Sequence, residues 1–391
     1  MRGSIIKRKG CSTYTIVLNL GKDPVTGHPK RQWVSVKGNK REAERRLAEL
    51  THQLNTGSYV KPRKMTVEDY MEQWLADYCL PNLQPRTTEG YEFIVRKYIV
   101  PSIGNIELTA LRPEHLQHFY TEKLLSGGKD GTGLSPRSVR YCHTTLHKAL
   151  KSAMRLGILS RNPADAVDPP RLKPREMQMM NEGEIQKLLE LAKSTQYYPI
   201  FYLALYTGLR RSELLALKWA DIDLLLCQLS VVRSLQQLRN GKVIEAPCKT
   251  DKSKRMVSLS PSTAIMLRQH KDQQTKLRKE LGIPVTENDY VFSHYDGSPI
   301  LPDSLSQAWR HLATKVGLKN IRLHDCRHTH ASLMLKAGIH PKIVSERLGH
   351  AGIQITLDTY SHVSPGLQEA AANAFDNIVM PQKNTEPELV C

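Results

Sequence analysis

A short proline-rich segment divides the chain and limits what it can fold into. The eight residues from Asp168 to Arg175 read DPPRLKPR and hold three prolines. Proline fixes one backbone torsion and removes an amide donor, so such a run stays extended instead of joining a helix or a sheet. The 391 residues are long enough for two or three domains with cores of their own. The sequence therefore predicts separate domains on either side of a linker at residues 166–178.

The N-terminal part of the chain is strongly basic. Residues 1–65 carry 15 Lys or Arg and 4 Asp or Glu, a net charge of +11 within a formal total of +18. Two strand patterns, Thr13–Leu20 and Gln32–Val36, flank a turn signal, and a helical pattern runs from Lys40 to Asn55. We expect residues 1–60 to form a small β-sheet with one helix, and its charge favours a polyanionic partner such as DNA.

Residues 66–165 read as an all-helical domain. Thr66 has the position of a helix cap, and later helical patterns cover about 86–99, 113–125 and 136–155. The pattern predicts a four-helix bundle, within a protein that is α+β and multidomain as a whole. Its cations form a surface that either contacts phosphates or is merely solvated: Arg86, Arg96, Lys97, Arg137, Arg140, Lys148 and Lys151.

The third predicted domain, 179–380, is mainly helical with β-hairpins. A nearly continuous apolar run from Tyr198 to Tyr206 predicts a deeply buried helix, which ends at Gly208 just before Arg210. Strand patterns follow at 226–235, 243–246 and 256–259. A last helix should present Leu367, Ala371, Phe375 and Ile378 on one face, and the polar residues 381–391 should be disordered.

The stretch from Arg322 to Val363 concentrates reactive side chains. It holds His324, Arg327, His350 and Tyr360. Arginine binds a phosphate with two parallel hydrogen bonds, histidine moves protons near neutral pH, and tyrosine can act as a covalent nucleophile. Together they indicate attack on a phosphodiester. His324 and His328 are also spaced for a metal, but there is no HExxH motif and no paired cysteine, so we expect no metal.

The order of these residues resembles the C-terminal half of the tyrosine recombinase (phage integrase) family. The family motif H-x-x-R is matched by His324 to Arg327, and its Leu-Gly-His by Leu348 to His350, with Tyr360 following. The family's T-G-x-R-x-x-E motif is matched by Thr207 to Glu213, which includes Arg210. A family lysine in a K-T-x-x-S-x-R context is matched by Lys249, although Lys252 and Lys254 lie close enough to be alternatives.

The resemblance implies site-specific DNA recombination through a 3′-phosphotyrosine intermediate. Tyr360 would be the nucleophile, Arg210 and Arg327 would hold the phosphate, and His350 would hydrogen-bond it. His324 would handle the tyrosine proton, and Lys249 would protonate the leaving 5′-oxygen. No cofactor is implied. The implied partners are double-stranded DNA at core and arm sites, a homotetramer on paired sites, an excisionase and a host DNA-bending protein.

Other readings of the sequence are kept in view. An Xer-type resolvase or a type IB-like topoisomerase shares the chemistry, although the basic N-terminal module argues for a second DNA site and against both. A non-catalytic DNA-binding regulator is disfavoured because all six catalytic positions are chemically intact. The seven cysteines include no C-x-x-C pair, and no run approaches about 18 apolar residues, so we expect a cytoplasmic protein with no membrane span.

Overall fold

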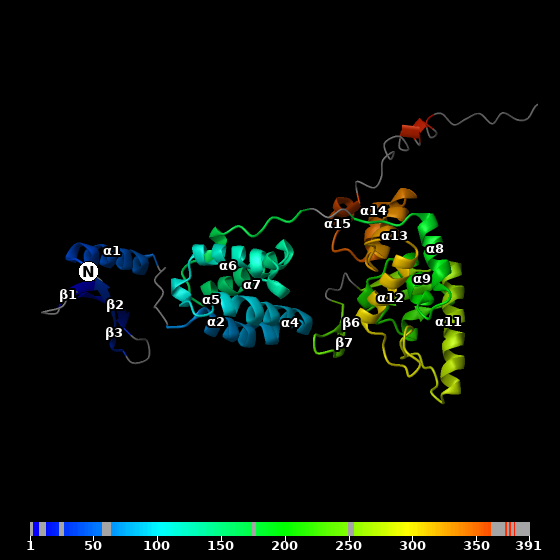
Figure 1. The fold of residues 1–391 in the computed structure, drawn as a ribbon, viewed down its shortest axis with the longest axis horizontal. Coiled ribbons are helices and arrows are strands. Elements are labelled where there is room, and N and C mark those ends of the chain that lie inside the picture. Colours follow the sequence, from blue (N-terminus) through cyan, green and yellow to red (C-terminus); the bar gives the residue numbers. More distant parts are fainter. Residues whose placement is uncertain are drawn as a thin grey trace, which may run out of the picture. The chain divides into compact units, whose positions relative to one another are not determined.

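The computed structural model describes two compact units, Met1–Lys173 and Pro174–Cys391 (Figure 1). Within them it describes residues 3–7, 13–22, 27–56, 64–173, 177–248 and 254–360, together with 372–373, 375–376 and 379. For Lys22 and Tyr360 it describes the backbone only.

The first unit begins with an antiparallel sheet in the order β1-β2-β3, covered on one face by a helix. The elements are β1 (Gly3–Lys7), β2 (Thr13–Lys22), β3 (Pro29–Lys37) and α1 (Lys40–Asn55). The two predicted strands and the helix are confirmed. Asn39 caps α1, because its side chain accepts from the Glu42 amide at 2.9 Å while Glu42 accepts from the Asn39 amide at 3.0 Å. Ile16 and Leu18 on the sheet pack with Leu50 of α1 in a small core.

Strand β1 was not predicted. Its apolar content is the pair Ile5-Ile6, which is too short for an alternating pattern to register. Pairing with β2 holds it in the sheet, with Ile5 opposite Ile16. The two predicted strands are therefore part of a three-stranded sheet.

The rest of the first unit is a helical bundle with a separate apolar core. Its elements are α2 (Val67–Trp74), η1 (Leu75–Cys79), α3 (Leu80–Asn82), α4 (Pro85–Ile94), η2 (Val95–Ile99), α5 (Val100–Ile103), η3 (Leu108–Ala110), α6 (Pro113–Ser126), η4 (Lys129–Gly131), α7 (Pro136–Arg155) and η5 (Pro163–Ala166). The four predicted helical stretches are confirmed. Thr66 caps the first of them through the Asp69 amide at 3.1 Å. Large buried side chains such as Phe119 and Tyr120 fill the interior between the helices.

The second unit surrounds the buried helix α9 with further helices and two small sheets (Figure 1). Its helices are α8 (Glu182–Ala192), α9 (Tyr198–Thr207), α10 (Arg211–Leu214), η6 (Trp219–Asp221), α11 (Pro261–Glu280), α12 (Pro302–Lys315), α13 (Asp325–Lys336), α14 (Pro341–Leu348) and α15 (Ile353–Tyr360). The predicted burial of α9 is confirmed, since Ile200 and Leu203 are almost completely buried. Both α8 and α13 pack against α9, and α13 also packs against α14.

The strands of this unit are β4 (Ile222–Asp223), β5 (Gln228–Val231), β6 (Arg233–Gln237), β7 (Val243–Pro247) and β8 (Arg255–Ser258). They form one sheet of order β4-β5-β8 and a separate β6-β7 hairpin. The expectation of a β-hairpin in this domain is confirmed by the pairing of β6 with β7, with Asn240-Gly241 in the turn. The single strand expected at 226–235 is wrong, because the chain changes sheets at Val232.

Most of the predicted last helix lies outside the described residues, including Leu367, Ala371 and Ile378, and so does the 381–391 tail. Phe375 is described and is exposed. Across the described ranges, no helix combines the length and the apolar character that a membrane crossing requires.

Candidate active site

Arg210 lies between the end of helix α9 and the start of helix α10, and both helix ends position it. Helix α9 ends at Gly208, whose φ of 65° is in the left-handed region that glycine adopts readily. Arg210 then precedes α10, where its amide donates to Glu213 Oε2 at 2.9 Å and its Nη1 donates to Glu213 Oε1 at 2.7 Å. The Arg210 side chain remains 36% exposed, so it is anchored at one edge and accessible at another.

Arg327 enters the same region from the first turn of α13. Its guanidinium is buried, and it donates from Nη1 to the Gly208 carbonyl at 3.0 Å and from Nη2 to the Leu348 carbonyl at 2.7 Å. These bonds fix the plane of the group between the end of α9 and the end of α14. Three segments that are far apart in sequence therefore meet at this side chain.

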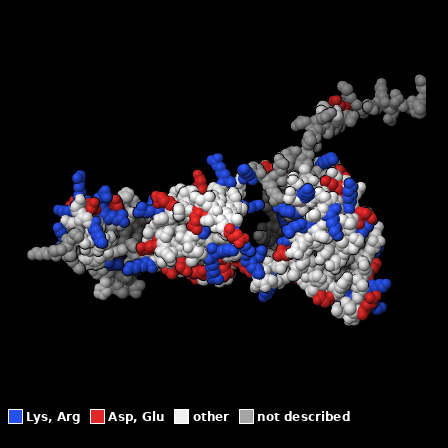
Figure 2. Space-filling model, viewed as in Figure 1, with Lys and Arg blue, Asp and Glu red and all other residues white. Residues whose placement is uncertain are grey.

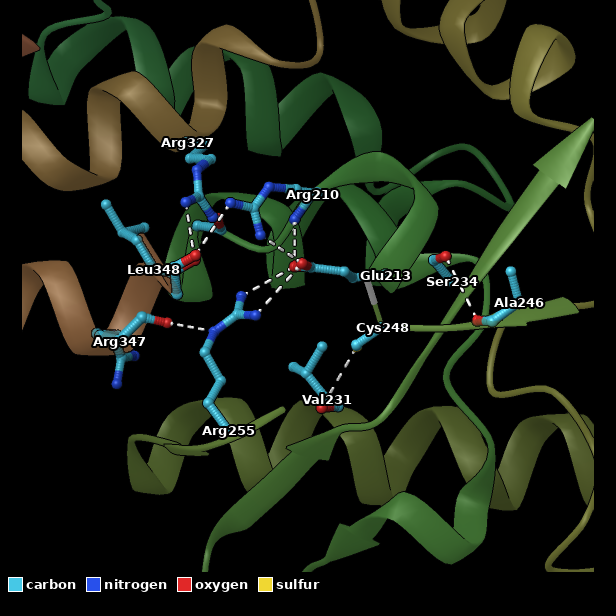
Figure 3. Close-up of polar contacts among 12 residues, drawn as sticks. Arg210, Glu213, Val231, Ser234, Ala246, Cys248, Arg255, Arg327, Arg347 and Leu348 are labelled. Atoms are coloured by element: carbon cyan, nitrogen blue, oxygen red, sulfur yellow. Dashed lines mark hydrogen bonds and ion pairs between the residues drawn. The ribbon is translucent and has the colours of Figure 1, made fainter. Parts of the chain in front are cut away.

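The C-terminus of α14 organises the site. It ends in a Schellman motif, in which the Gly349 amide donates to Glu346 O and the His350 amide donates to Ser345 O, both at 3.0 Å. The carbonyls that follow have no partners within the helix and carry partial negative charge. Figure 3 shows that arginines reach them instead.

Three consecutive carbonyls accept from three arginines. Arg255 Nε donates to Arg347 O at 2.7 Å, Arg327 Nη2 donates to Leu348 O at 2.7 Å, and Arg210 Nη2 donates to Gly349 O at 3.1 Å (Figure 3). The structure thus brings Arg210 and Arg327 together beside His350. That histidine is held in turn by a hydrogen bond of 2.8 Å between its Nδ1 and Thr356 Oγ1.

Sequence reasoning gave no role to Arg255. It closes the K-T-x-x-S-x-R stretch in the sequence, which is the one signal that pointed to it. In the structure Arg255 donates to both oxygens of Glu213, at 3.2 and 2.8 Å, so one buried carboxylate joins Arg255 to Arg210. Burial alone raises the pKa of Glu213, but the hydrogen bonds and charge of Arg255, with the charge of Arg210, outweigh it and lower that pKa.

The histidines of the site are neutral at pH 7. Removal of water lowers the pKa of His350 to about 4, and the charges of Arg327 and Arg210 act in the same direction. The pKa of His324 is also lowered to about 4, first by desolvation and then by His328 and Arg327. Although its ring nitrogens are desolvated, His324 as a residue is exposed at the start of α13.

The spacing of His324 and His328 does not develop into a metal site in the part of the chain that the structure describes. Their rings meet edge to face with centroids 5.0 Å apart. The nearest acidic residue along the helix, Asp325, is buried and pairs with Arg322 at 2.9 Å. No group of three or more His, Cys, Asp or Glu among the described residues is arranged to hold a metal ion.

Two of the predicted site residues fall partly or wholly outside the description. Lys249 lies in 249–253, beyond the described residues, as does its alternative Lys252, whereas Lys254 is described and exposed. Tyr360 is the last residue of α15, a helix that packs against α14. The structure therefore assembles Arg210, Arg327 and His350, sets His324 on the same helix as Arg327, and gives Tyr360 a backbone position only.

Acid should destabilise the protein through three histidines. The pKa values of His324, His330 and His350 are about 4, below the ordinary 6.5. Between these values the unfolded chain binds more protons than the folded one, so the free energy of unfolding falls as the pH falls from about 6.5 towards 4. Urea unfolding across this range should show the loss, and a variant with glutamine at all three positions should lose less. An unchanged slope in that variant would contradict the assignment.

The comparisons with known proteins identify the family of the chain. The family model described as "Phage integrase family" matches residues 178–366, and that for its "N-terminal SAM-like domain" matches residues 66–124. The ICEBs1 integrase of Bacillus subtilis is 30% identical over 96% of this chain and 100% of its own. A protein named tyrosine recombinase XerC-like from Caldanaerobacter subterraneus is 28% identical over 95% of this chain and 97% of its own.

Solved structures share the fold. The Tn1549 transposon integrase in complex with circular intermediate DNA is similar with a TM-score of 0.65 at 20% identity, covering 80% of this chain and 100% of that one. A lambda integrase tetramer bound to a Holliday junction gives a TM-score of 0.57 at 17% identity, covering 92% and 95%. The fold, the paired arginines and the sequence relatives define one class: the chain belongs to the phage integrase family. It is a tyrosine recombinase, an enzyme of site-specific DNA recombination.

Proposed function

We propose that this recombinase integrates and excises a mobile element, and that it cuts DNA with Tyr360. The Tyr360 oxygen forms a bond to the scissile phosphorus while the bond from phosphorus to the 5′-oxygen breaks. The product is a 3′-phosphotyrosine with a free 5′-hydroxyl. A different 5′-hydroxyl then attacks this linkage and restores the DNA backbone. The energy of the phosphodiester is retained throughout, so no ATP and no metal are consumed.

One observation carries the proposal. At the C-terminal end of α14, Arg210 donates to the Gly349 carbonyl and Arg327 donates to the Leu348 carbonyl, directly before His350 in the chain. Two fixed guanidiniums can stabilise the negative charge that builds on a five-coordinate phosphorus, without having to reorient during the reaction. His350 supplies a further hydrogen bond to the phosphate. Pre-set groups of this kind are commonly the largest contribution to catalysis of such a reaction.

The protons need a base and an acid. Tyrosine has an ordinary pKa near 10, so its hydroxyl is a weak nucleophile at neutral pH unless a base takes the proton. We assign this role to His324, which is exposed at the start of α13 and neutral at pH 7. We assign protonation of the leaving 5′-oxygen to Lys249, with Lys252 and Lys254 as the alternatives.

The proposed division of the chain is into an arm-binding domain at 1–60, a core-binding domain at 66–165, a linker at 166–178, a catalytic domain at 179–380 and a tail at 381–391. The seven cations of the bundle, for which the sequence left phosphate contact and solvation open, are not equivalent. Arg96 pairs with Glu72 at 3.0 Å and also with Glu92, and Lys148 lies over the Tyr91 ring at 5.2 Å. Exposed cations such as Arg137 and Lys151 are better candidates for DNA contacts.

The N-terminal sheet has a free face suited to reading a second DNA site. Helix α1 covers one face, and β3 exposes Arg31, Trp33 and Ser35 on the other. Trp33 is 60% exposed, which is unusual for so large an aromatic side chain. Figure 2 shows Lys and Arg side chains gathered over α1 as well. Strands can enter the major groove of DNA, so we propose that this face reads arm-type sites.

Deletion of residues 1–60 should separate two activities. Cleavage at core sites should be largely retained, whereas integration on long sites with flanking DNA should fall at least roughly tenfold, because linkage of two binding modules raises the effective concentration at the second site.

Trp33→Ala in the full chain should protect the same core site in a footprint but lose the distinct flanking one. Flanking protection that persists in this variant would contradict base reading by this face. Purely salt-labile, sequence-blind binding would reduce the domain to an electrostatic anchor.

The proposed assembly is a homotetramer on two paired core sites, since recombination of two duplexes cuts four strands and each chain supplies one Tyr360. The lambda integrase with the same fold is a tetramer on its Holliday junction. We further propose an excisionase and a host DNA-bending protein as partners that set direction, because arm and core sites must be brought together along bent DNA.

A second candidate, an Xer-type resolvase, is favoured by one observation. The XerC-like relative aligns over 95% of this chain, so the alignment leaves little room for a missing N-terminal module. Direct repeats at the ends of an element around the gene would support integration. Resolution of dimeric plasmids without flanking arm sites would support the resolvase.

The test of the proposed chemistry is a covalent trap. In a core-site substrate with a nick near the cleavage site, cleavage releases the short fragment that carries the free 5′-hydroxyl. Because this hydroxyl is no longer available for rejoining, the protein–DNA adduct accumulates. We expect an adduct at the 3′-phosphate, linked to Tyr360, that forms equally well in excess EDTA. Loss of the adduct in EDTA with recovery on adding a divalent ion would reject metal-free chemistry and return attention to His324 and His328.

A further inference from the structure

The side chain of Arg347, which the proposed reaction does not use, bridges three other elements. From α14 its Nε donates to His330 Nε2 at 3.1 Å, its Nη1 donates to Ser258 O at 2.9 Å, and its Nη2 donates to Tyr206 O at 3.1 Å. These partners lie on α13, at the end of β8 and in the last turn of α9 respectively. Arg347 is half-buried; its bond to His330 is partly buried, whereas its bonds to Ser258 O and Tyr206 O are exposed.

The bond to Arg347 also fixes the state of His330. A guanidinium has only donors, so His330 Nε2 must accept and therefore carries no proton. The other ring nitrogen, Nδ1, holds the proton and donates to Leu205 O at 2.9 Å. The imidazole is consequently neutral and in one tautomer.

Together the two side chains cap the end of α9. The last carbonyls of a helix have no partner within it. In α9, Leu205 O receives His330 and Tyr206 O receives Arg347, within five residues of Arg210. Arg347 itself lies three residues before His350, and its own carbonyl is the one that accepts from Arg255.

The two helix ends that these side chains join are in close contact. A Cβ added at Gly208 would come within 2.7 Å of Leu348 Cδ2 and 2.9 Å of His330 Cδ2. The end of α9 therefore packs directly against the end of α14. There is no room for even one more methyl group at Gly208 between the two helix ends. The distance from Arg210 to His350 is set across this junction.

We propose that Arg347 and His330 form a positioning pair, which locks the ends of α9 and α14 together so that Arg210, Arg327 and His350 keep the spacing of one phosphate. The proposal rests on the proposed cleavage chemistry, because its consequence is a rate of phosphotyrosine formation. In this proposal neither residue contacts the DNA, and both act through the groups that do. Without the pair the three binding groups would remain, but their spacing would vary.

The experiment uses the full chain, with the rate of adduct formation on the nicked core-site substrate and the dissociation constant for intact core DNA as separate readouts. Arg347→Met and His330→Phe should each slow adduct formation roughly 10- to 100-fold, the range expected for a displacement of about 1 Å in a reacting group. DNA affinity should change less than about threefold, since DNA is held by many other contacts. Arg347→Lys, which keeps a donor, should recover part of the rate.

The double variant distinguishes a pair from two separate residues. If Arg347 and His330 act as one unit, Arg347→Met with His330→Phe should be about as slow as either single variant. Multiplied losses in the double variant would overturn the proposal. So would single variants that remain folded and cleave at the wild-type rate, or that lose binding and cleavage equally.

A matched control accounts for loss of stability. Arg278 is also a buried arginine, but it is not part of the junction between α9 and α14. It donates to Pro284 O and forms an ion pair with Asp289, in which the nitrogen and oxygen are 3.2 Å apart. Arg278→Met should lower the melting temperature but cleave normally at temperatures where it is folded. Slow cleavage in this control, equal to that of Arg347→Met, would show that any destabilisation slows the reaction and would overturn the proposal. Failure of the wild-type protein to form an adduct would instead reject the proposed function.

Discussion

Tyr360→Phe should form no detectable adduct on the nicked core-site substrate while it still binds that DNA. The substitution removes one hydroxyl and keeps the ring, so the attacking oxygen is lost with the smallest change in the size of the side chain. The proposed mechanism uses Tyr360 as its only nucleophile, so loss of this hydroxyl should abolish the covalent step. Among the substitutions considered, this one should have the largest effect on the reaction.

Binding and covalent capture need to be measured on the same preparation. Gel mobility before and after denaturation separates the two. Tyr295→Phe is a suitable control, since Tyr295 is exposed on a loop of the same unit and the change removes the same atom. Tyr295→Phe should react as the wild type does. An adduct in Tyr360→Phe, or one lost equally in both variants, would refute the assignment of the nucleophile.

The local elements of the site could be predicted because their signals are local. Gly208 and Gly349 both stop helices in the left-handed conformation, and the stop at Gly208 was predicted. Residues that follow a stop are placed at a helix end, which is where Arg210 and His350 lie. Short-range backbone preferences therefore account for the position of these side chains along the chain.

The partners of those side chains could not be predicted, because they are distant in sequence. Glu213 and Arg255 are 42 residues apart, and Arg210 and Gly349 are 139 apart. Helical pattern and composition contain no information on which carbonyl a guanidinium will reach. The same limit applies to β1, whose place depends on its pairing with β2, and to Arg96, whose ion pair with Glu72 the sequence did not predict.

The buried carboxylate of Glu213 provides the last test. Glu213 and Arg255 are each about 5% exposed at their side chains, and Arg210 shares the same carboxylate. Glu213→Ala leaves the buried guanidinium of Arg255 and the partly exposed guanidinium of Arg210 without their anion. Removal of one partner from a buried ion pair typically costs about 3–5 kcal/mol, so we expect a loss of unfolding free energy of that order.

The control is an exposed pair. Lys271 and Glu287 are 2.7 Å apart, but the Glu287 side chain is 66% exposed. Glu287→Ala should therefore change the free energy of unfolding by no more than about 1 kcal/mol. Urea unfolding of both variants at pH 7 gives the comparison, and a similar small loss in both would contradict a buried network.

The stabilisation of the folded protein by Glu213 should depend on pH. The pKa of Glu213 is lowered below its ordinary 4.5 in the folded protein, so its contribution is complete above that value and is lost as the pH falls through the lowered pKa. The difference between wild type and Glu213→Ala should therefore be largest near neutral pH and shrink in acid. Because the same carboxylate orients Arg210, the variant should also cleave more slowly where it is still folded. A variant that is destabilised but cleaves at the wild-type rate would mean that Gly349 O alone is enough to direct Arg210.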